Sequence, residues 1–179
     1  RRVEYVSVGD GSVNNAHFLS AVNFAEYCAH RGAGMPVVFG VADNDASISL
    51  AGHGWLPKFI EQRLGGCEIY KCDGADGHDV FRAAAEAFAY ARSEQRPAVL
   101  VVEDLPRRFG HAATDRQDAY LSSTEIEGRR ARDPLAGFIG DAVERGVLDA
   151  ETVAARNDEI SRAVRAAFDA AAAEPKLDD

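Results

Sequence analysis

The sequence predicts an α/β fold in which helices cover a doubly wound, mostly parallel sheet. Short apolar segments with the character of buried strands alternate with segments of helical periodicity, which is the pattern of such sheets. The chain has 179 residues, of which 46% are hydrophobic and 27% charged. This length and composition are typical of one globular domain with one core.

The predicted elements begin with a strand, a helix and a second strand. The first strand has buried character and is preceded by no cap, loop or helix, so we expect the chain to start in mid-domain. Gly32 and Gly34 should end the first helix, and the second strand then lies parallel to the first through a right-handed crossover. The expected strands cover residues 3–8, 36–42, 67–72 and 97–103. The expected helices cover residues 16–28, 58–64 and about 79–93; a loop at 52–55 precedes the second helix, and Asp79 caps the third. A polar loop at 106–123 and two C-terminal helices follow.

The last predicted helix, at about residues 150–173, is rich in alanine but still amphipathic. Apolar side chains recur along it at helical spacing, which favours a surface helix over a disordered tail. The stripe consists of Val153, Ile160, Val164 and Phe168.

Charge and hydropathy exclude several classes of protein. The formal net charge of -9 would repel a nucleic-acid backbone, and we interpret the basic run of Arg129, Arg130 and Arg132 as a solvated helix face. No segment approaches the roughly 20 apolar residues of a membrane helix, and the N-terminus lacks the apolar core of a signal peptide. We therefore expect a soluble, intracellular chain without a nucleic-acid or membrane partner.

The three cysteines predict neither a disulfide framework nor a zinc site. Cys28, Cys67 and Cys72 are odd in number and lack the CxxC spacing. We expect buried, structural thiols.

Polar clusters follow the predicted strands at the points where the strands end. Residues 9–11 are Gly-Asp-Gly, residues 43–45 are Asp-Asn-Asp, and the loop after the fourth strand holds His111. The carboxyl ends of parallel strands form one edge of the sheet, where ligands of α/β proteins bind. We therefore expect these three clusters to lie around one site.

The chemistry of these clusters favours a diphosphate held through a cation. Gly9 and Gly11 allow backbone N–H groups to face an anion at a helix N-terminus. A carboxylate beside a diphosphate would be repelled unless a metal joined them, so Asp10 is a candidate magnesium ligand. Asn44 offers an amide oxygen and a residue near Ala46 offers a carbonyl oxygen. Either cluster alone is more typical of a plain turn, but the two together, separated by a helix and a strand, form the pattern of thiamine diphosphate enzymes.

The pattern extends over nearly the whole chain. Its pieces are residues 8–12, 21–25, 43–49, 73–74, 79–81, 108–111, 115, 120–122 and 132–134. In this order and spacing they resemble the alpha subunits of the thiamine diphosphate-dependent dehydrogenase component of 2-oxoacid dehydrogenase complexes, of the branched-chain and pyruvate types.

The resemblance implies roles for individual residues. Asp10 and Asn44 would bind magnesium through their side chains and Ala46 through its carbonyl oxygen. Gly9, Gly11 and Ser12 would line the diphosphate. His111 matches the histidine that lies over the cofactor on a mobile loop, helps to bind the diphosphate and assists acyl transfer to a lipoyl group; a solvent-exposed loop histidine is the alternative.

Several residues depart from the family pattern. The usual pair of asparagines is Asp43-Asn44 here, and the glycine and bulky residue that usually follow are Asp45 and Ala46. Asp45 adds negative charge near the diphosphate. An arginine often precedes the asparagines, and its place is taken by Ala42, which removes a phosphate contact. Ala112 replaces a serine that kinases phosphorylate in some members.

The resemblance also implies an assembly. Residues 1–130 would form a thiamine diphosphate-binding domain without its N-terminal part, and residues 131–179 a C-terminal helical segment. A beta subunit or beta-like domain would complete the cofactor site, and the partners would be a lipoyl acyltransferase and a small 2-oxoacid. We expect an oligomer, inactive as an isolated chain, in a bacterial cytoplasm or a mitochondrial matrix, with the composition favouring a bacterium.

Three other interpretations stay open at this stage. A transketolase-like or acetoin dehydrogenase-like enzyme would share the Gly-Asp-Gly and Asn elements. A noncatalytic fragment or degenerate assembly subunit would explain Ala42, Asp45 and Ala112. A generic nucleotide-binding domain ranks low, because neither a GxGxxG nor a GxxxxGK[ST] run occurs.

Overall fold

A computed structural model describes residues 2–48 and 51–175 of the chain. Its centre is a parallel sheet of four strands in the order β1-β2-β4-β3. The strands are β1 (Glu4–Gly9), β2 (Val37–Ala42), β3 (Glu68–Asp73) and β4 (Ala98–Glu103). The register aligns Gly9 with Ala42 and Cys72 with Val102, so the carboxyl ends of all four strands lie at one edge. The predicted parallel α/β architecture is confirmed.

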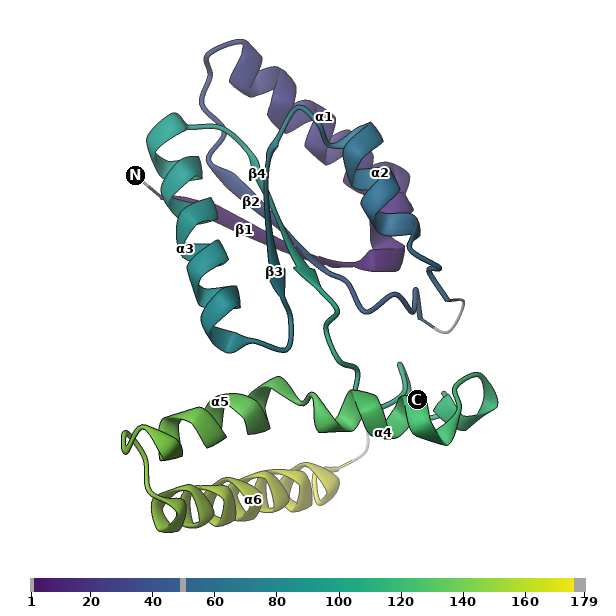
Figure 1. The fold of residues 1–179 in the computed structure, drawn as a ribbon, viewed down its shortest axis with the longest axis vertical. Coiled ribbons are helices and arrows are strands. Elements are labelled where there is room, and N and C mark those ends of the chain that lie inside the picture. The colour runs from purple at the N-terminus through teal and green to yellow at the C-terminus, as the bar shows by residue number, and fades with distance from the viewer. Residues whose placement is uncertain (1, 49–50, 176–179) are drawn as a thin grey trace. The chain divides into compact units, whose positions relative to one another are not determined.

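Helices cover both faces of the sheet, and each face has its own apolar core (Figure 1). On one face, α1 (Ala16–His30) and α2 (Trp55–Arg63) pack against the sheet, with Val22, Phe39 and Ile60 in the cluster. On the other face, α3 (Gly77–Glu94) packs through alanines 83, 87 and 91, which recur every four residues along one side of the helix. Because these side chains are small, α3 lies close to the sheet.

The first strand differs from its prediction as a buried strand. Tyr5 and Val6 are 51% and 39% exposed, and four of the other positions in β1 are exposed or half-buried. The reason is topological: β1 is an edge strand and pairs only with β2 among the described strands, whereas β2 and β4 lie in the middle of the sheet and are almost wholly buried. An apolar sequence shows that a strand can be buried, but not which strand has neighbours on both sides.

Local capping explains where the helices begin. Asn15 caps α1 through its side chain, which accepts from the amide of His17. Asp76, rather than the predicted Asp79, caps α3 by accepting from the amides of His78 and Asp79. Asp79 instead accepts from the amide of Asp73 and pairs with Arg82. The helix therefore begins at Gly77, two residues before the start expected from the sequence.

Two smaller expectations also change. The loop expected at 52–55 ends one residue early, because Gly54 takes a left-handed conformation (φ 69°) and Trp55 already begins α2. The three thiols are free; Cys67 and Cys72 are buried as expected, whereas Cys28 is only half-buried. Burial, followed by the charge of Glu26, raises the pKa of the Cys67 thiol to about 12.

Three α-helices, rather than the two expected, follow the polar loop. They are α4 (Ser123–Ala131), α5 (Pro134–Glu144) and α6 (Ala150–Ala172), and the loop itself contains a short 3-10 helix, η2 (Gln117–Ala119). α4 ends with Arg132 as its C-cap, and the side chain of Asp133 accepts from the amide of Leu135 in the next helix, which divides the segment. The chain forms two compact units, residues 1–138 and 139–179, and the predicted division at 130/131 stays a prediction.

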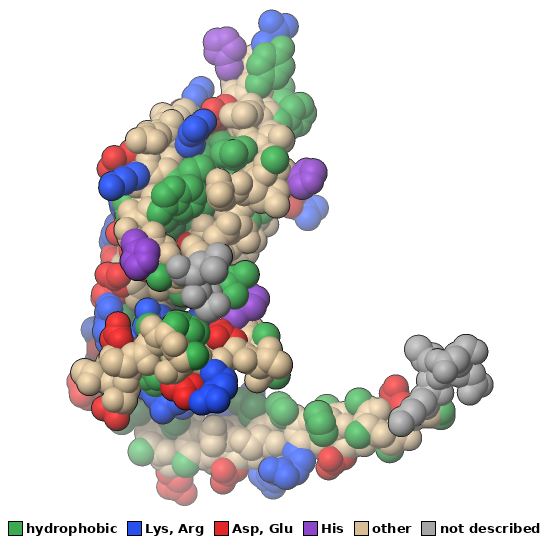
Figure 2. All heavy atoms as spheres, turned by 90° about the vertical axis from the view of Figure 1, so that its right-hand side faces the viewer, with side chains coloured by type: hydrophobic (Ala, Val, Ile, Leu, Met, Phe, Trp, Pro, Cys, Tyr) green, Lys and Arg blue, Asp and Glu red, His purple; other side chains and the backbone are tan. Residues whose placement is uncertain are grey.

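The second unit contains no buried residue within its described part. Ile160, Val164 and Phe168 are 52%, 63% and 74% exposed along α6, and Figure 2 shows hydrophobic side chains along one edge of this helix with charged side chains on the opposite edge. The helix is amphipathic as predicted. No helix within residues 2–48 and 51–175 is long and apolar enough to span a membrane.

Candidate functional site

Asp10 is a buried carboxylate at the edge formed by the carboxyl ends of the strands. It follows β1 directly, as the first residue of a short 3-10 helix, η1 (Asp10–Asn14), and only 6% of it is exposed. One carboxylate oxygen accepts from the amide of Gly11 at 2.8 Å. The other accepts from the amides of Ala46 and Ser47 at 3.1 and 3.0 Å. Asp10 therefore connects the end of β1 to the segment that follows β2.

Asn44 and Asp10 point their oxygens at the same atom. The side-chain oxygen of Asn44 lies 3.0 Å from the amide nitrogen of Ala46, and Asp10 Oδ2 lies 3.1 Å from that nitrogen. The Ala46 carbonyl oxygen accepts from the amide of Ala51. This N–H group thus holds a carboxylate oxygen and an amide oxygen close to each other, and hard oxygens of these two types suit magnesium.

Asp43 fixes the end of β2 to its neighbour in the sheet. Its amide donates to the carbonyl of Val102 at 2.9 Å, and its carbonyl accepts from the amide of Leu105 at 2.8 Å. Its side chain is buried and accepts from the amide of Asp45. Burial raises the pKa of the Asp43 carboxyl, and the nearby charge of Asp10 raises it further, although the hydrogen bond from Asp45 opposes the shift.

The backbone after Asn44 takes a conformation that glycine would adopt more readily. Asp45 has φ 50°, in the left-handed region, at the position where glycine is usual in the resembling family. Its side chain accepts from the amide of Gly54, which closes this loop. Gly11 allows the loop to approach closely, because a Cβ at that position would lie 3.3 Å from Ser47 Cα.

The predicted diphosphate-lining residues lie beside Asp10. Gly9 and Ser12 are exposed, and a Cβ added at Gly9 would meet no atom within 4 Å, so its backbone is open to a ligand. Gly11 is partly covered by the loop at Ser47. Their backbone amides stand at the start of η1, ahead of α1.

The loop that carries His111 is held by a network around Asp115. The amide of His111 donates to Asp115 Oδ2 at 2.5 Å, and Arg107 and the hydroxyl of Tyr120 bind the same oxygen. Arg107 also contacts the Tyr120 hydroxyl and donates to the carbonyl of Ile48 at 2.5 Å. Arg107 therefore joins the His111 loop to the loop after β2.

The imidazole of His111 itself is exposed, and it makes no hydrogen bond or ion pair with another residue of the described ranges. The structure thus brings Asp10, Asn44 and Ala46 together and connects their loop to the His111 loop through Arg107. It does not place the His111 side chain in contact with the other three.

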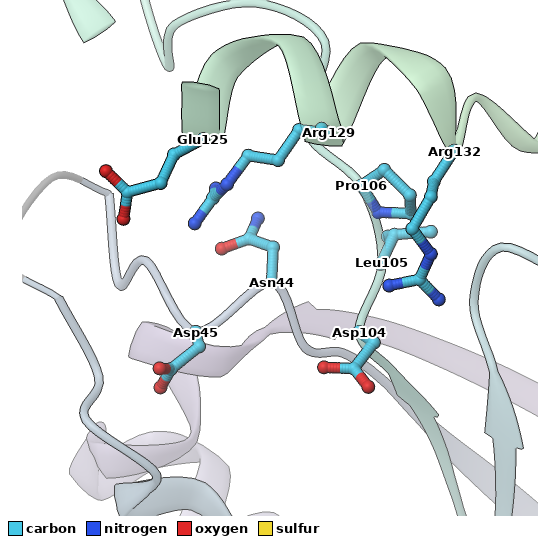
Figure 3. Close-up of a pocket in the computed structure, with 9 residues that line it drawn as sticks. Asn44, Asp45, Asp104, Leu105, Pro106, Glu125, Arg129 and Arg132 are labelled. Carbon is cyan, nitrogen blue, oxygen red and sulfur yellow. The ribbon is translucent and has the colours of Figure 1, made fainter. Parts of the chain in front are cut away.

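A cavity of about 430 Å³ opens beside Asn44, between the ends of β2 and β4 and the helix α4 (Figure 3). Its strand side carries Asn44, Asp45 and Asp104, and its helix side carries Arg129 and Arg132. The basic run predicted to be a solvated helix face is therefore divided. Arg130 is exposed, but Arg129 is half-buried and lines the cavity with Arg132.

Arg107, Arg129 and Arg132 were not among the predicted site residues. The spacing of Glu125, Arg129 and Arg132 places them on one face of a helix and could have indicated that they act together. No group of three or more His, Cys, Asp or Glu side chains in the described residues could hold a metal ion. This finding does not bear on the predicted set, in which only Asp10 belongs to those types.

The chain is a doubly wound α/β protein with a cavity at the carboxyl ends of its strands, the edge where ligands of such folds bind. The model of the family described as "Dehydrogenase E1 component" matches residues 1–179, and the chain belongs to this family.

Curated relatives of this chain are named as alpha subunits of such dehydrogenases. It is 29% identical over 134 residues to the pyruvate dehydrogenase E1 component subunit alpha of Rickettsia felis, covering 73% of this chain and 39% of that protein. It is 28% identical over 171 residues to the 2-oxoisovalerate dehydrogenase subunit alpha of Bacillus subtilis, covering 93% and 50%. The corresponding pyruvate dehydrogenase subunit of Porphyra purpurea is 33% identical over 141 residues, covering 75% and 38%. The chain thus spans half or less of the length of these relatives.

Proposed function

We propose that this chain supplies the diphosphate- and magnesium-binding part of a 2-oxoacid dehydrogenase that transfers an acyl group to lipoamide. The observation that carries the proposal is that Asp10 Oδ2 and Asn44 Oδ1 both accept from the amide of Ala46, which keeps the two proposed ligand oxygens close to each other. Family membership supports the same interpretation, because relatives are named as pyruvate and 2-oxoisovalerate dehydrogenase alpha subunits.

The residues at the strand ends suit magnesium and a diphosphate. Asp10 would contribute a carboxylate oxygen, Asn44 an amide oxygen and Ala46 its carbonyl oxygen, which is a hard-oxygen set. Gly9, Gly11 and Ser12 would present backbone amides to the phosphates at the start of η1. When bound, thiamine diphosphate supplies the carbanion chemistry that a 2-oxoacid decarboxylation needs.

The remaining residues of the site would orient and close it. Arg107 and Asp115 hold the loop of His111, so that the imidazole can be presented from a fixed backbone. His111 would help to bind the diphosphate and to position the acyl group for transfer to the lipoyl group. Asp43 holds the end of β2 against β4 and thereby fixes the direction in which Asn44 points.

The proposal requires partners. A beta subunit or beta-like domain would complete the cofactor site, and a lipoyl acyltransferase would receive the acyl group. Exposed apolar side chains on β1, α1 and α6, such as Tyr5, Phe24 and Phe168, are consistent with an oligomer. We therefore expect the isolated chain to be inactive in acyl transfer.

Calorimetric titration with thiamine diphosphate, with and without magnesium, tests the proposal. The expected result is binding that requires magnesium and is lost in Asp10→Ala. Asp118→Ala serves as a matched control, because Asp118 is an exposed aspartate whose side chain pairs with Arg116 alone among residues 2–48 and 51–175. The titration is made on the protein in the assembly in which it is purified. Magnesium-independent binding, or binding that survives in Asp10→Ala, would overturn the proposal.

A further inference from the structure

Arg129 is a basic residue of α4, and its side chain lines the cavity beside Asn44. Glu125, Arg129 and Arg132 follow one another at intervals of four and three residues and therefore share one helix face. That face lines the cavity opposite Asn44 and Asp45. Figure 3 shows the Arg129 side chain extending from α4 toward the side chain of Asn44.

The two arginines of this wall differ in their partners. Arg132 donates to both carboxylate oxygens of Asp73, at 3.0 and 3.2 Å. Arg129 is half-buried and makes no hydrogen bond or ion pair with any residue in 2–48 or 51–175. The charge of Glu125, one turn earlier on the same face, acts on Arg129 without forming an ion pair. A guanidinium partly removed from water without a hydrogen-bond acceptor costs free energy, which an anionic ligand would recover. Arg132 is already occupied, so Arg129 is the group available to a ligand.

The composition of the cavity limits what that ligand can be. Asp45 and Asp104 line it on the strand side, and Glu125 lines it on the same helix face as Arg129 and Arg132, so a free anion would meet three carboxylates as well as two guanidiniums. A phosphate that shares a magnesium ion with Asp10 and Asn44 avoids this repulsion, because the metal offsets the negative charge. Guanidinium groups bind phosphate oxygens in a bidentate manner and keep their charge at all relevant pH values.

A second observation concerns the end of β2. Ala42 ends this strand, two residues before Asn44, and the register places it beside Gly9 and Val102. Its methyl side chain provides no cation at this strand end. Arg129 approaches the same Asn44 from the opposite side, on α4.

We propose that Arg129 binds the diphosphate that Asp10 and Asn44 hold through magnesium, and that it provides the cationic phosphate ligand that the methyl side chain of Ala42 cannot provide. This inference rests on the proposed function, since the diphosphate is that of the proposed cofactor. It adds a residue outside the strand-end motifs, from a helix that folds back over them.

The experiment compares four forms of the protein in the assembly in which it is purified: wild type, Arg129→Met, Arg130→Met and the double variant Ala42→Arg with Arg129→Met. Methionine keeps the apolar part of the side chain, and because Arg129 makes no ion pair in the described residues its loss should leave the urea midpoint unchanged. Arg130 is the matched control, since it is exposed and one residue away on the same helix. Each form is titrated with magnesium thiamine diphosphate and with magnesium pyrophosphate.

The expected result is a loss of affinity of about 10- to 100-fold for both probes in Arg129→Met, the range for a charge-assisted hydrogen bond. Arg130→Met should stay within about twofold of wild type, and Ala42→Arg should restore part of the affinity to the double variant. Wild-type affinity in Arg129→Met would overturn the inference and leave the proposed function intact. Failure of wild type to bind either probe would overturn both. Arg129-dependent binding of pyrophosphate without binding of thiamine diphosphate would support the anion site and overturn the proposed cofactor.

Discussion

The buried carboxylate of Asp10 accepts a hydrogen bond from the amide of Ala46, a residue 36 positions further along the chain. It also accepts from the amide of Ser47, so one side chain satisfies two donors in the loop after β2. The contact joins the ends of two neighbouring parallel strands. Asp10 therefore contributes to folding as well as to the proposed metal site, and the two contributions can be separated by measurement.

Asp10→Ala is expected to destabilise the chain even when no cofactor is present. The amide of Ala46 can still donate to Asn44, but that of Ser47 has no other acceptor among the described contacts. A fully buried donor without an acceptor costs about 1–3 kcal/mol. Because Ser47 is only half-buried, the free energy of unfolding should fall by an amount near the lower end of that range in urea titrations. Asp118→Ala, a change at an exposed side chain, should leave it nearly unchanged. An unchanged midpoint for Asp10→Ala would mean that water replaces the carboxylate without loss.

Asp43→Asn is expected to stabilise the chain in a pH-dependent manner. Burial raises the pKa of Asp43 above its ordinary value of 3.8, so the folded state favours the protonated form. The wild-type chain therefore loses stability as the pH rises from 3.8 through the raised pKa. Asparagine keeps the oxygen that accepts from Asp45 and carries no charge. The gain in free energy of unfolding should be largest near pH 7 and shrink toward about pH 4.

The control for this prediction is Asp118, whose pKa is shifted in the opposite direction. A hydrogen bond from Arg116 lowers the pKa of Asp118, whose contribution to stability is present above pH 3.8 and lost as the pH falls through its lowered pKa. In Asp118→Asn any difference from wild type should therefore be a loss, and it should shrink as the pH falls. A gain in Asp43→Asn that did not vary with pH would indicate that packing, rather than charge, is responsible.

The meeting of the two strand-end motifs could be predicted from the sequence, because neighbouring parallel strands have their carboxyl ends at the same edge of the sheet. Once β1 and β2 are expected to be parallel neighbours, Gly-Asp-Gly and Asp-Asn-Asp must meet at one edge, and Asp10 and Asn44 do so. The alanine spacing of α3 and the apolar centres of β2 and β4 likewise follow from local periodicity. These features depend on residues close in sequence or on one crossover.

The features that escaped prediction depend on tertiary arrangement. The apolar residues of β1 do not reveal that this strand lies at an edge of the sheet. Asp76 and Asp79 are both able to cap α3, and the direction of the preceding turn decides between them. Arg129 belongs to a charged run whose sequence is equally typical of a solvated helix face. It lines the cavity because α4 packs near the ends of the strands, which the sequence does not reveal.

Arg107→Leu is expected to loosen the His111 loop. Arg107 donates to the carbonyl of Ile48 and contacts Asp115 and Tyr120, so its loss separates this loop from the one after β2. Chymotrypsin should cut at the exposed Phe109 roughly 10-fold faster than in wild type, as expected if local opening becomes easier by about 1.4 kcal/mol. Arg116→Leu, which removes an exposed ion pair in the same loop, should leave the rate nearly unchanged. Equal rates in all three proteins would show that Arg107 does not hold the loop.

Asp45→Asn is expected to strengthen the binding of magnesium thiamine diphosphate. The carboxylate of Asp45 lines the cavity beside Asn44 and repels a diphosphate, whereas asparagine tolerates the same left-handed backbone and can still accept from Gly54. Removing one charge at partly solvated range should lower the dissociation constant by roughly two- to fivefold, and the effect should weaken in high salt. Asp104→Asn is a parallel test of the same charge effect, because Asp104 lines the same cavity and also has φ 50°. If affinity rises in neither variant, negative charge in this cavity does not oppose the diphosphate, and the departure from the family pattern at Asp45 has no electrostatic cost.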